Sequence, residues 1–285
     1  MLVLPVPFDL PVERRYVSDI AWKHGLRAIT FDFGNTLVPV DRAALRRVVE
    51  ATAAAVVVRL GPFELERFLE VWAEERERQF REEVPQFREV DLADRFVRVI
   101  ARLRGMPPPA ATERWDQTAA ARLSEPAEID WAVDIYSRAF VDVIPAPPAV
   151  GPLLERLAAD YRLAILSNWP LAATIDWYVE AAGWAPHFAA IVISQRIGTI
   201  KPHPAIFAAA ASALGDPPAG TIIHVGDDWA ADVVGAAQAG WRTAYFDARP
   251  TDSPLPSSRR DGSVVPDLEL TDLADLATVL QPVAR

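Results

Sequence analysis

Short apolar segments alternate with helical patterns over the second half of the chain. The apolar segments are typical of buried strands and predict strands at residues 163–166, 190–193, 222–225, 243–246 and 268–270. The segments with apolar positions at helical spacing predict helices at 153–159, 172–182, 204–214, 230–239 and 273–280. This alternation indicates βαβ units with right-handed crossovers, and therefore a mostly parallel sheet with helices on its faces.

A first strand is predicted much earlier, at residues 27–32, and a long helical region separates it from the others. Between 41 and 143, apolar residues recur at helical spacing, and Gly and Pro divide the pattern into four or five helices with no convincing strand. We therefore predict an α/β fold, a doubly wound mostly parallel sheet built from residues 1–40 and 144–285. An all-helical cap domain, residues 41–143, is inserted into it.

Three further segments lie outside this alternation. Residues 12–23 form a possible short helix in a Pro-containing lead-in, and residues 144–148 are a Pro-rich linker back into the sheet domain. Residues 249–263 are rich in Pro, Ser and charge, which predicts a mobile loop.

Composition narrows the possible classes of function. The chain has 285 residues, 51% of them hydrophobic, and a net charge of −10 at pH 7, so it is globular and has no basic footprint for nucleic acid. It has 0 Cys, which excludes disulfides, thiolate catalysis and Cys-based metal sites. Neither a basic leader nor an apolar run of about eighteen residues is found, so we expect a cytoplasmic protein with no membrane partner.

Polar residues that could take part in catalysis or ligand binding follow four of the predicted strands. Asp32 ends the first strand and begins Asp32-Phe33-Gly34-Asn35-Thr36, and Ser167-Asn168 follows the second. Lys201-Pro202 lies in the loop after the third, and Asp227-Asp228 follows the fourth, with Asp232 on the helix that opens there. Because the carboxyl ends of parallel strands meet at one edge of a sheet, we expect these side chains to lie together.

Lysine is rare in this chain, which makes one of these positions stand out. Lys23 and Lys201 are the only lysines among 29 Lys and Arg residues. A compact ammonium suits a corner between two oxyanions better than a planar guanidinium does, so Lys201 is a candidate functional residue. The alternative interpretation is that the two lysines occur by chance and have no functional reason.

The ordered set Asp-x-x-x-Thr, Ser-Asn, Lys-Pro and Gly-Asp-Asp-x-x-x-Asp resembles the haloacid dehalogenase superfamily of hydrolases. The resemblance covers residues 26–40 and 144–281, and the helical region matches in position a cap of the C1 type. It implies an Asp32 nucleophile that forms an aspartyl-phosphate, a chemistry that divides one difficult displacement into two easier ones. It also implies a Mg²⁺ cofactor, because the repulsion between a carboxylate and a phosphate dianion must be cancelled.

The resemblance also suggests a role for each motif residue. Besides Asp32, the catalytic residues are Ser167, which donates to a phosphoryl oxygen, and Lys201, which contacts both nucleophile and phosphate. The residues expected to bind phosphate or substrate are Gly34, Asn35, Thr36, Asn168 and Trp169. The residues expected to hold the metal, directly or through water, are Asp32, Gly34 through its carbonyl, Asp227, Asp228 and Asp232.

Several of these residues also have a purely structural interpretation. Asp228 is as well placed to cap the helix that follows it as to bind metal, and Thr36 could simply close a turn. His203 and His224 are acid–base candidates, but packing or a structural hydrogen bond is the more economical explanation for each.

The sequence departs from the family at Gly34, where most phosphatases of this family have an Asp that protonates the leaving group and activates water. The alternatives are a phosphatase that uses another acid or a good leaving group, a metal-independent haloacid dehalogenase, and a weakly catalytic module that binds phosphate and metal. The acidic motif at Asp227 and Asp228 favours Mg²⁺ chemistry over dehalogenation. A phosphonate hydrolase would need a cap lysine, and residues 41–143 contain none.

We therefore predict a Mg²⁺-dependent phosphohydrolase acting on a small phosphorylated metabolite. The catalytically weak regulatory module is the second hypothesis. On the sequence alone, Gly34→Asp is expected to raise the hydrolysis of esters with poor leaving groups.

Overall fold

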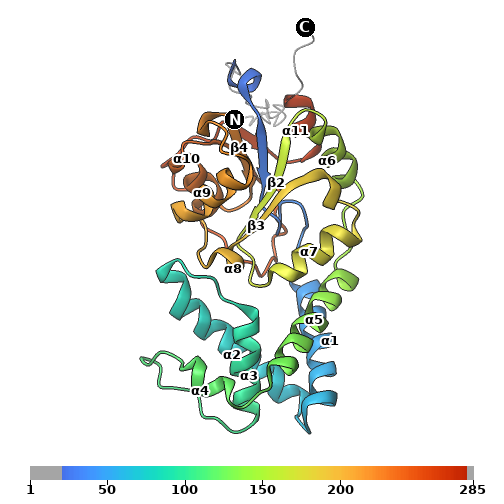
Figure 1. Cartoon of the computed structure of the whole chain (residues 1–285), viewed down its shortest axis with the longest axis vertical. Helices are drawn as coiled ribbons and strands as arrows, with labels where there is room; N and C mark the ends of the chain where they lie inside the picture. The colour runs from blue at the N-terminus through green and yellow to red at the C-terminus, as the bar shows by residue number, and fades with distance from the viewer. Residues whose placement is uncertain (1–20, 281–285) are drawn as a thin grey trace, which may run out of the picture.

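The computed structural model describes residues 21–280. Within this range a six-stranded sheet runs in the order β3-β2-β1-β4-β5-β6, and every neighbouring pair is parallel (Figure 1). The strands are β1 (Ala28–Phe31), β2 (Arg162–Ser167), β3 (Phe188–Ile193), β4 (Ile222–Gly226), β5 (Arg242–Phe246) and β6 (Leu268–Leu270). The predicted strands and the parallel, doubly wound sheet are confirmed.

Strand β1 lies at the centre of the sheet, and its side chains supply both faces. Ile29 and Phe31 join the hydrophobic cluster on one face, whereas Ala28 joins the cluster on the other. In β2, Ile165 and Leu166 divide between the same two clusters. This follows from the two-residue period of a strand and explains why the strand segments are almost continuously apolar, since both faces are buried.

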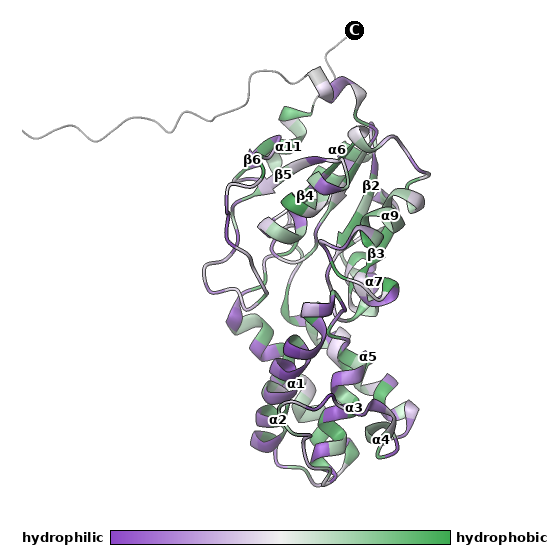
Figure 2. Cartoon of the chain, turned by 90° about the vertical axis from the view of Figure 1, so that its left-hand side faces the viewer, coloured by the Kyte–Doolittle hydropathy of each residue, from purple (hydrophilic) through white to green (hydrophobic). Residues whose placement is uncertain are grey.

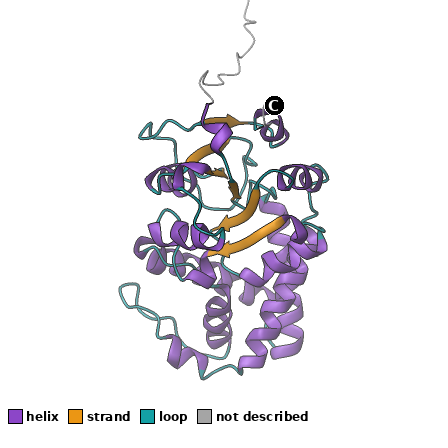
Figure 3. Ribbon diagram, turned by 45° about the horizontal axis from the view of Figure 1, so that its top comes forward, coloured by secondary structure: helices purple, strands orange, loops and turns teal. Residues whose placement is uncertain are grey.

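Helices cover both faces of the sheet (Figure 3). The helices of the sheet domain are α6 (Val150–Ala158), α7 (Ala172–Ala181), α8 (Ser194–Ile197), α9 (Pro204–Ala213), α10 (Gly235–Gln238) and α11 (Ala274–Val279). Helices α6 and α11 pack together, and so do α9 and α10. The short helix α8 was not predicted, because four residues give no readable period.

The second body consists of five helices between β1 and α6. They are α1 (Arg42–Leu60), α2 (Leu65–Glu83), α3 (Leu92–Leu103), α4 (Gln117–Ala121) and α5 (Pro126–Val143). Asp41 and Asp91 cap α1 and α3, and each accepts a backbone N–H of the first turn. Figures 1 and 2 show these helices grouped at one end of the sheet domain, and the sequence of α2 is rich in charged residues. The predicted inserted helical cap is thus confirmed.

The helix after β4 differs from the prediction of a single helix at 230–239. Residues Trp229–Val234 form a π-helical turn, and α10 follows it. The Val233 N–H lies 3.4 Å from the Asp228 carbonyl, five residues earlier, which widens the turn. π-Helical turns occur frequently at functional sites, and this one carries Asp232.

Two other expectations lie at the limits of the described chain. The possible helix at 12–23 falls mostly outside the described residues, and only a short 3₁₀ helix, Ala21–Gly25, is seen. Within residues 21–280, no helix combines the length and apolar character that crossing a membrane requires.

The sheet domain and the cap meet in a cluster of aromatic rings around Phe33. Its ring lies 5.3 Å from that of Trp169 and 5.2 Å from that of Tyr178, centroid to centroid, both edge-on. Phe140, from cap helix α5, lies 6.4 Å away. Because Phe33 is fully buried one residue after Asp32, this packing also fixes the loop that carries the candidate nucleophile.

We predict that Phe33→Ala lowers the free energy of unfolding by about 3–5 kcal/mol, because it leaves a cavity in a packed aromatic cluster. Urea denaturation measures the loss. Phe87→Ala is the control, since its ring is 44% exposed and much less area is returned to water. Equal losses in the two variants would show that the junction is not tightly packed.

Candidate functional site

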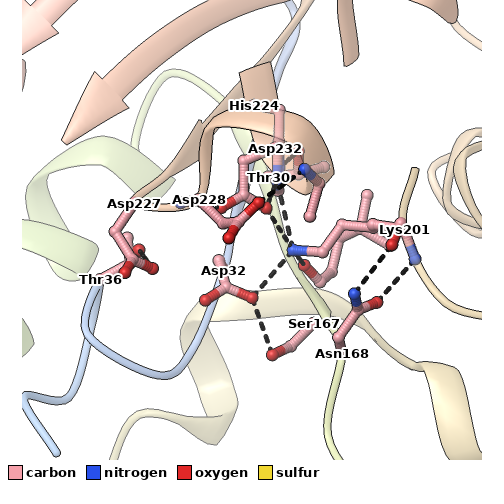
Figure 4. Close-up of polar contacts among 12 residues, drawn as sticks. Thr30, Asp32, Thr36, Ser167, Asn168, Lys201, His224, Asp227, Asp228 and Asp232 are labelled. Carbon is pink, nitrogen blue, oxygen red and sulfur yellow. Dashed lines mark hydrogen bonds and ion pairs between the residues drawn. The ribbon is translucent and has the colours of Figure 1, made fainter. Parts of the chain in front are cut away.

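The predicted site residues converge at the carboxyl edge of the sheet (Figure 4). Asp32 follows β1, and its backbone N–H donates to the Val225 carbonyl at 2.9 Å, so the β1–β4 pairing continues up to the carboxylate. Ser167 is the last residue of β2, and Asp227 comes directly after β4. Because the strands are parallel, their carboxyl ends lie at one edge of the sheet, and these side chains are brought together there.

Lys201 lies between two carboxylates at the centre of the site. Its Nζ is 2.8 Å from Asp32 Oδ1 and 2.6 Å from Asp232 Oδ1, and its side chain is only 1% exposed. Burial alone would lower the pKa of Lys201, but Asp232 and Asp32 outweigh burial and raise it. Lys201 is therefore a permanently charged ammonium next to the candidate nucleophile.

Asn168 holds Lys201 in place through a pair of backbone hydrogen bonds. Its Oδ1 accepts the Lys201 backbone N–H at 2.7 Å, and its Nδ2 donates to the Lys201 carbonyl at 3.0 Å. Lys201 Nζ also donates to the Leu166 carbonyl at 2.8 Å. Asn168 was expected to bind phosphate; its amide is instead used to position the lysine.

Asp32 keeps one carboxylate oxygen free of protein donors among the described residues. Ser167 Oγ and Lys201 Nζ both donate to Oδ1, at 2.9 and 2.8 Å. Burial is the largest influence on the pKa of Asp32 and raises it to about 6, against the opposing effect of Lys201. An oriented carboxylate with one free oxygen has the geometry of an attacking group.

A buried chain of polar groups supports Asp232 from behind. Asp232 Oδ1 lies 3.1 Å from His224 Nε2, and His224 Nδ1 lies 2.8 Å from the Thr30 hydroxyl. Burial, together with Lys201, lowers the pKa of His224, so its ring is neutral. Lys201 and His224 hold the pKa of Asp232 below its usual range, although burial alone would raise it. His224 is thus a structural residue, as the simpler interpretation of the sequence proposed.

Three buried carboxylates lie close enough to hold one metal ion. Ligand oxygens of Asp32, Asp227 and Asp232 all lie within 4.8 Å of one another. Burial first, and then Asp32 and Asp232, raise the pKa of Asp227 to about 8. Such crowding of like charges favours a bound cation, and oxygen donors are the ligands that Mg²⁺ prefers. The donor set therefore fits Mg²⁺. Asp32 has one oxygen without a protein donor among the described residues, and the Asp227 oxygens accept only the longer contacts from Thr36 at 3.4 Å and Arg249 at 3.1 Å. The Asp232 oxygens accept shorter bonds, from Lys201 at 2.6 Å and the Asp228 N–H at 2.8 Å, so Asp232 is the less available ligand.

The structure gives Asp228 a different position from the other acidic residues. Its Oδ1 accepts the Ala231 N–H at 2.8 Å and caps the π-helical turn, and its Oδ2 accepts the Ser258 N–H at 2.7 Å. It is not part of the cluster of three carboxylates. Of the two roles considered for Asp228, these contacts favour helix capping.

The loop after Asp32 is also held largely by contacts within the protein. Asn35 has a positive φ of 60°, and its Oδ1 accepts the Val40 N–H at 3.1 Å. The Thr36 hydroxyl donates to Asp227 Oδ1 at 3.4 Å, so it orients a candidate metal ligand. Trp169 is buried and lines a cavity together with Asp32. Of the expected phosphate-binding residues, Gly34, Asn35, Asn168 and Trp169 line this cavity.

Residues 249–263, which we call the strap, cross the site in a way that the sequence did not reveal. Arg249 pairs with Asp227 Oδ2 at 3.1 Å, Ser253 Oγ accepts from Asn35 at 3.0 Å, and Ser258 binds Asp228. The Pro254 carbonyl accepts from Arg76 of the cap at 3.1 Å. The composition predicted a loop; its contacts with both bodies could not be predicted.

The position that would hold the missing acid is filled by the strap. A Cβ placed on Gly34 would lie 2.6 Å from Leu255 Cδ1 and 3.0 Å from Trp169 Cζ3. A side chain at position 34 therefore requires the end of Leu255 to move and presses against the Trp169 ring, so the expected gain of activity from Gly34→Asp depends on that movement.

The chain belongs to the haloacid dehalogenase-like hydrolases, whose family model matches residues 26–240. It is 27% identical over 130 residues to a pyrimidine 5′-nucleotidase of Escherichia coli. The aligned residues cover 46% of this chain and 56% of that protein. It is 29% identical over 169 residues to a glyceraldehyde 3-phosphate phosphatase of Methanopyrus kandleri, 56% of this chain and 67% of the relative. The match thus spans only about half of the first of these proteins.

Solved structures resemble the whole described chain. A 2-haloacid dehalogenase from Pseudomonas syringae pv. tomato superposes with a TM-score of 0.62 at 23% identity, over 90% of this chain and 98% of that one. A phosphatase of the same family from Thermococcus onnurineus gives a TM-score of 0.56 at 18% identity, over 90% and 98%. These likenesses establish the fold. The family match identifies a hydrolase.

We predict that Gly34→Asp lowers the free energy of unfolding by about 1–3 kcal/mol, because it overpacks the space taken by Leu255 and Trp169. The double variant Gly34→Asp/Leu255→Ala should recover much of this loss. Urea denaturation of both variants measures the effect. A Gly34→Asp variant as stable as the parent would contradict the close contact with the strap.

Proposed function

We propose that this protein is a Mg²⁺-dependent phosphohydrolase acting on a small phosphorylated metabolite. The observation that supports it most strongly is the buried Lys201 ammonium, which contacts Asp32 beside the carboxylate cluster that includes Asp227. The cavity that contains these groups measures about 290 Å³, at the small end of the usual range for ligand sites. We also propose residues 1–40 and 144–285 as the catalytic domain and 41–143 as a C1-type cap.

The first step transfers the phosphoryl group to the protein. The free Oδ2 of Asp32 attacks phosphorus in line with the ester oxygen, so that an O–P bond forms as the P–O bond to the leaving group breaks. Lys201 and Ser167 neutralise charge on the phosphoryl oxygens and hold Asp32 in line. A Mg²⁺ ion held by Asp32, Asp227 and the Gly34 carbonyl supplies further charge neutralisation when bound. The departing oxygen takes its proton from water, because Gly34 offers none.

The second step releases phosphate. Water attacks phosphorus of the aspartyl-phosphate, the bond to Asp32 breaks, and the carboxylate is regenerated. No carboxylate stands at position 34 to activate this water, so we expect hydrolysis to be slower by about 10²–10⁴-fold than with a positioned general base.

The second candidate function is a weakly catalytic module that binds phosphate and metal. The observation that favours it is Leu255, which fills the position of the missing acid. A measurement of turnover distinguishes the two candidate functions, because the second requires only that phosphate and metal bind. Metal-independent dehalogenation is the remaining alternative, and it would leave the Asp227 carboxylate without a role.

We predict Mg²⁺-dependent release of phosphate in steady-state assays with a panel of phosphate esters. Asp32→Asn should abolish it because the amide is not a nucleophile. Lys201→Met should lower kcat by about 10²–10³-fold, corresponding to ~2.7–4 kcal/mol of lost transition-state stabilisation. A folded wild-type protein that hydrolyses no ester but still binds phosphate analogues would establish the binding module instead.

We predict that Asp227→Asn abolishes Mg²⁺ binding, measured by isothermal titration calorimetry without substrate. Asp228→Asn, its neighbour in the same motif, should retain binding within a few-fold, because Asp228 caps a helix and lies outside the cluster. Equal loss in both variants would return Asp228 to the ligand set. Activity of Asp227→Asn in the presence of a chelator would support the dehalogenase.

A further inference from the structure

The cavity that contains Asp32 continues into the cap. Its walls include Arg76 from α2, Arg95 from α3 and Tyr136 from α5. Apolar side chains form much of the remaining wall. They include Leu45, Phe80, Val90, Leu92, Trp169 and Ile200. One cavity is therefore lined by the phosphoryl-transfer groups, by two arginines and by apolar side chains.

Neither arginine forms an ion pair with a carboxylate among residues 21–280. Arg76 donates to the Pro254 carbonyl at 3.1 Å, and its guanidinium lies 4.8 Å from the centre of the Phe80 ring. Arg95 donates from Nε to Gln79 Oε1 at 2.8 Å and lies 5.2 Å from the centre of the Trp72 ring. Each guanidinium group thus donates to a neutral group and forms no ion pair, although Glu77 near Arg76 and Glu89 near Arg95 supply some opposite charge.

Other buried arginines of the same cap are compensated. Arg98 Nη1 lies 2.8 Å from Glu82, and Arg102 Nη1 lies 2.9 Å from Glu75. The cap thus supplies a carboxylate to these two buried guanidinium groups, although Arg98 also lines a second cavity. A guanidinium group without an ion-pair partner is costly to remove from water. Arg95 is buried and Arg76 is partly buried, so their exception needs a cause.

The remaining carboxyl group near this end of the cavity is Glu89, and it is directed elsewhere. Glu89 accepts from the Ser194 hydroxyl and, through Oε1, from the Val90 N–H at 2.8 Å. Burial raises the pKa of Glu89. Burial, together with repulsion from Arg76, lowers the pKa of Arg95 to about 10, so the two guanidinium groups are close enough to repel each other. An anion placed between them would relieve that repulsion.

We propose that Arg76 and Arg95 bind a second anionic group of the substrate, a carboxylate or a second phosphate, while its ester phosphate lies at Asp32. This inference rests on the proposed phosphohydrolase function and names its substrate class. The apolar part of the cavity wall accommodates a short carbon chain that joins the two anions. Guanidinium groups suit this task, because their planar fork forms paired hydrogen bonds with carboxylate or phosphate oxygens.

Matched pairs of small phosphate esters test the proposal. In each pair, one ester carries a carboxylate where the other has a neutral group: 3-phosphoglycerate against glycerol 3-phosphate, and 2-phosphoglycolate against ethyl phosphate. We expect the carboxylated ester of at least one pair to have a kcat/KM at least ten-fold higher, because charged hydrogen bonds to a buried site are worth about that factor or more. Arg76→Gln and Arg95→Lys should each lower kcat/KM for the carboxylated ester about ten-fold more than for its neutral partner, which abolishes the preference.

Arg67→Gln is the matched control, because Arg67 lies on the same helix α2, is exposed and pairs with Glu70 at the surface. It should keep the preference of the parent. Thermal unfolding checks each variant, and Arg76→Gln alone decides if Arg95→Lys does not fold. The proposal would be overturned if Arg76→Gln still preferred the carboxylated esters. It would also be overturned if the parent protein showed no such preference in either pair.

Binding measurements separate this inference from the proposed function. Isothermal titration calorimetry of Asp32→Asn with the same four esters requires no turnover. Tighter binding of the carboxylated esters that Arg76→Gln abolishes would support the anion site even if the parent hydrolyses none of them. Hydrolysis of all four esters without any charge preference would refute the anion site and leave the phosphohydrolase intact.

Discussion

The buried contact between Lys201 and its two carboxylates is the interaction on which the site depends. It joins the end of β1, the loop after α8 and the turn after β4, three segments far apart in the sequence. An ammonium removed from water is stable here only because Asp32 and Asp232 compensate it, and removing one partner of such a pair typically costs about 3–5 kcal/mol. The same contact that orients the candidate nucleophile therefore also helps hold the strand ends together.

The charges around this contact explain the rest of the geometry. Asp32, Asp227 and Asp232 bring more negative charge than Lys201 alone can balance, and burial together with this charge raises the pKa of Asp227 to about 8. Arg249 from the strap supplies part of the balance through its ion pair with Asp227. The carboxylate that Arg249 contacts is also a proposed ligand of Mg²⁺, so the strap and the proposed metal site share Asp227. At the cap end of the cavity the imbalance is reversed, since neither Arg76 nor Arg95 forms an ion pair among residues 21–280.

The sequence allowed the sheet and the central site residues to be predicted, because strand ends in a parallel sheet must meet. Asp32, Ser167, Lys201 and Asp227 each follow an apolar run, so their convergence required only the strand order. The roles of Asn168 and Asp228 could not be assigned in this way, because an amide or carboxylate has the same sequence signal whether it binds a ligand or the backbone. The strap was equally hidden: a Pro- and Ser-rich segment predicts a loop, but not that Leu255 fills the space beside Gly34.

Trapping the covalent state tests the central claim most directly. The protein would be mixed with Mg²⁺ and a phosphate ester that it hydrolyses, and the reaction would be quenched in acid within one turnover. The quenched protein would then be reduced with borohydride and analysed by peptide mass spectrometry. Reduction converts an aspartyl-phosphate to homoserine, so we predict this change at Asp32, with none in Lys201→Met under the same quench time. Turnover of the ester without any modification of Asp32, or with modification at another carboxylate, would contradict the account.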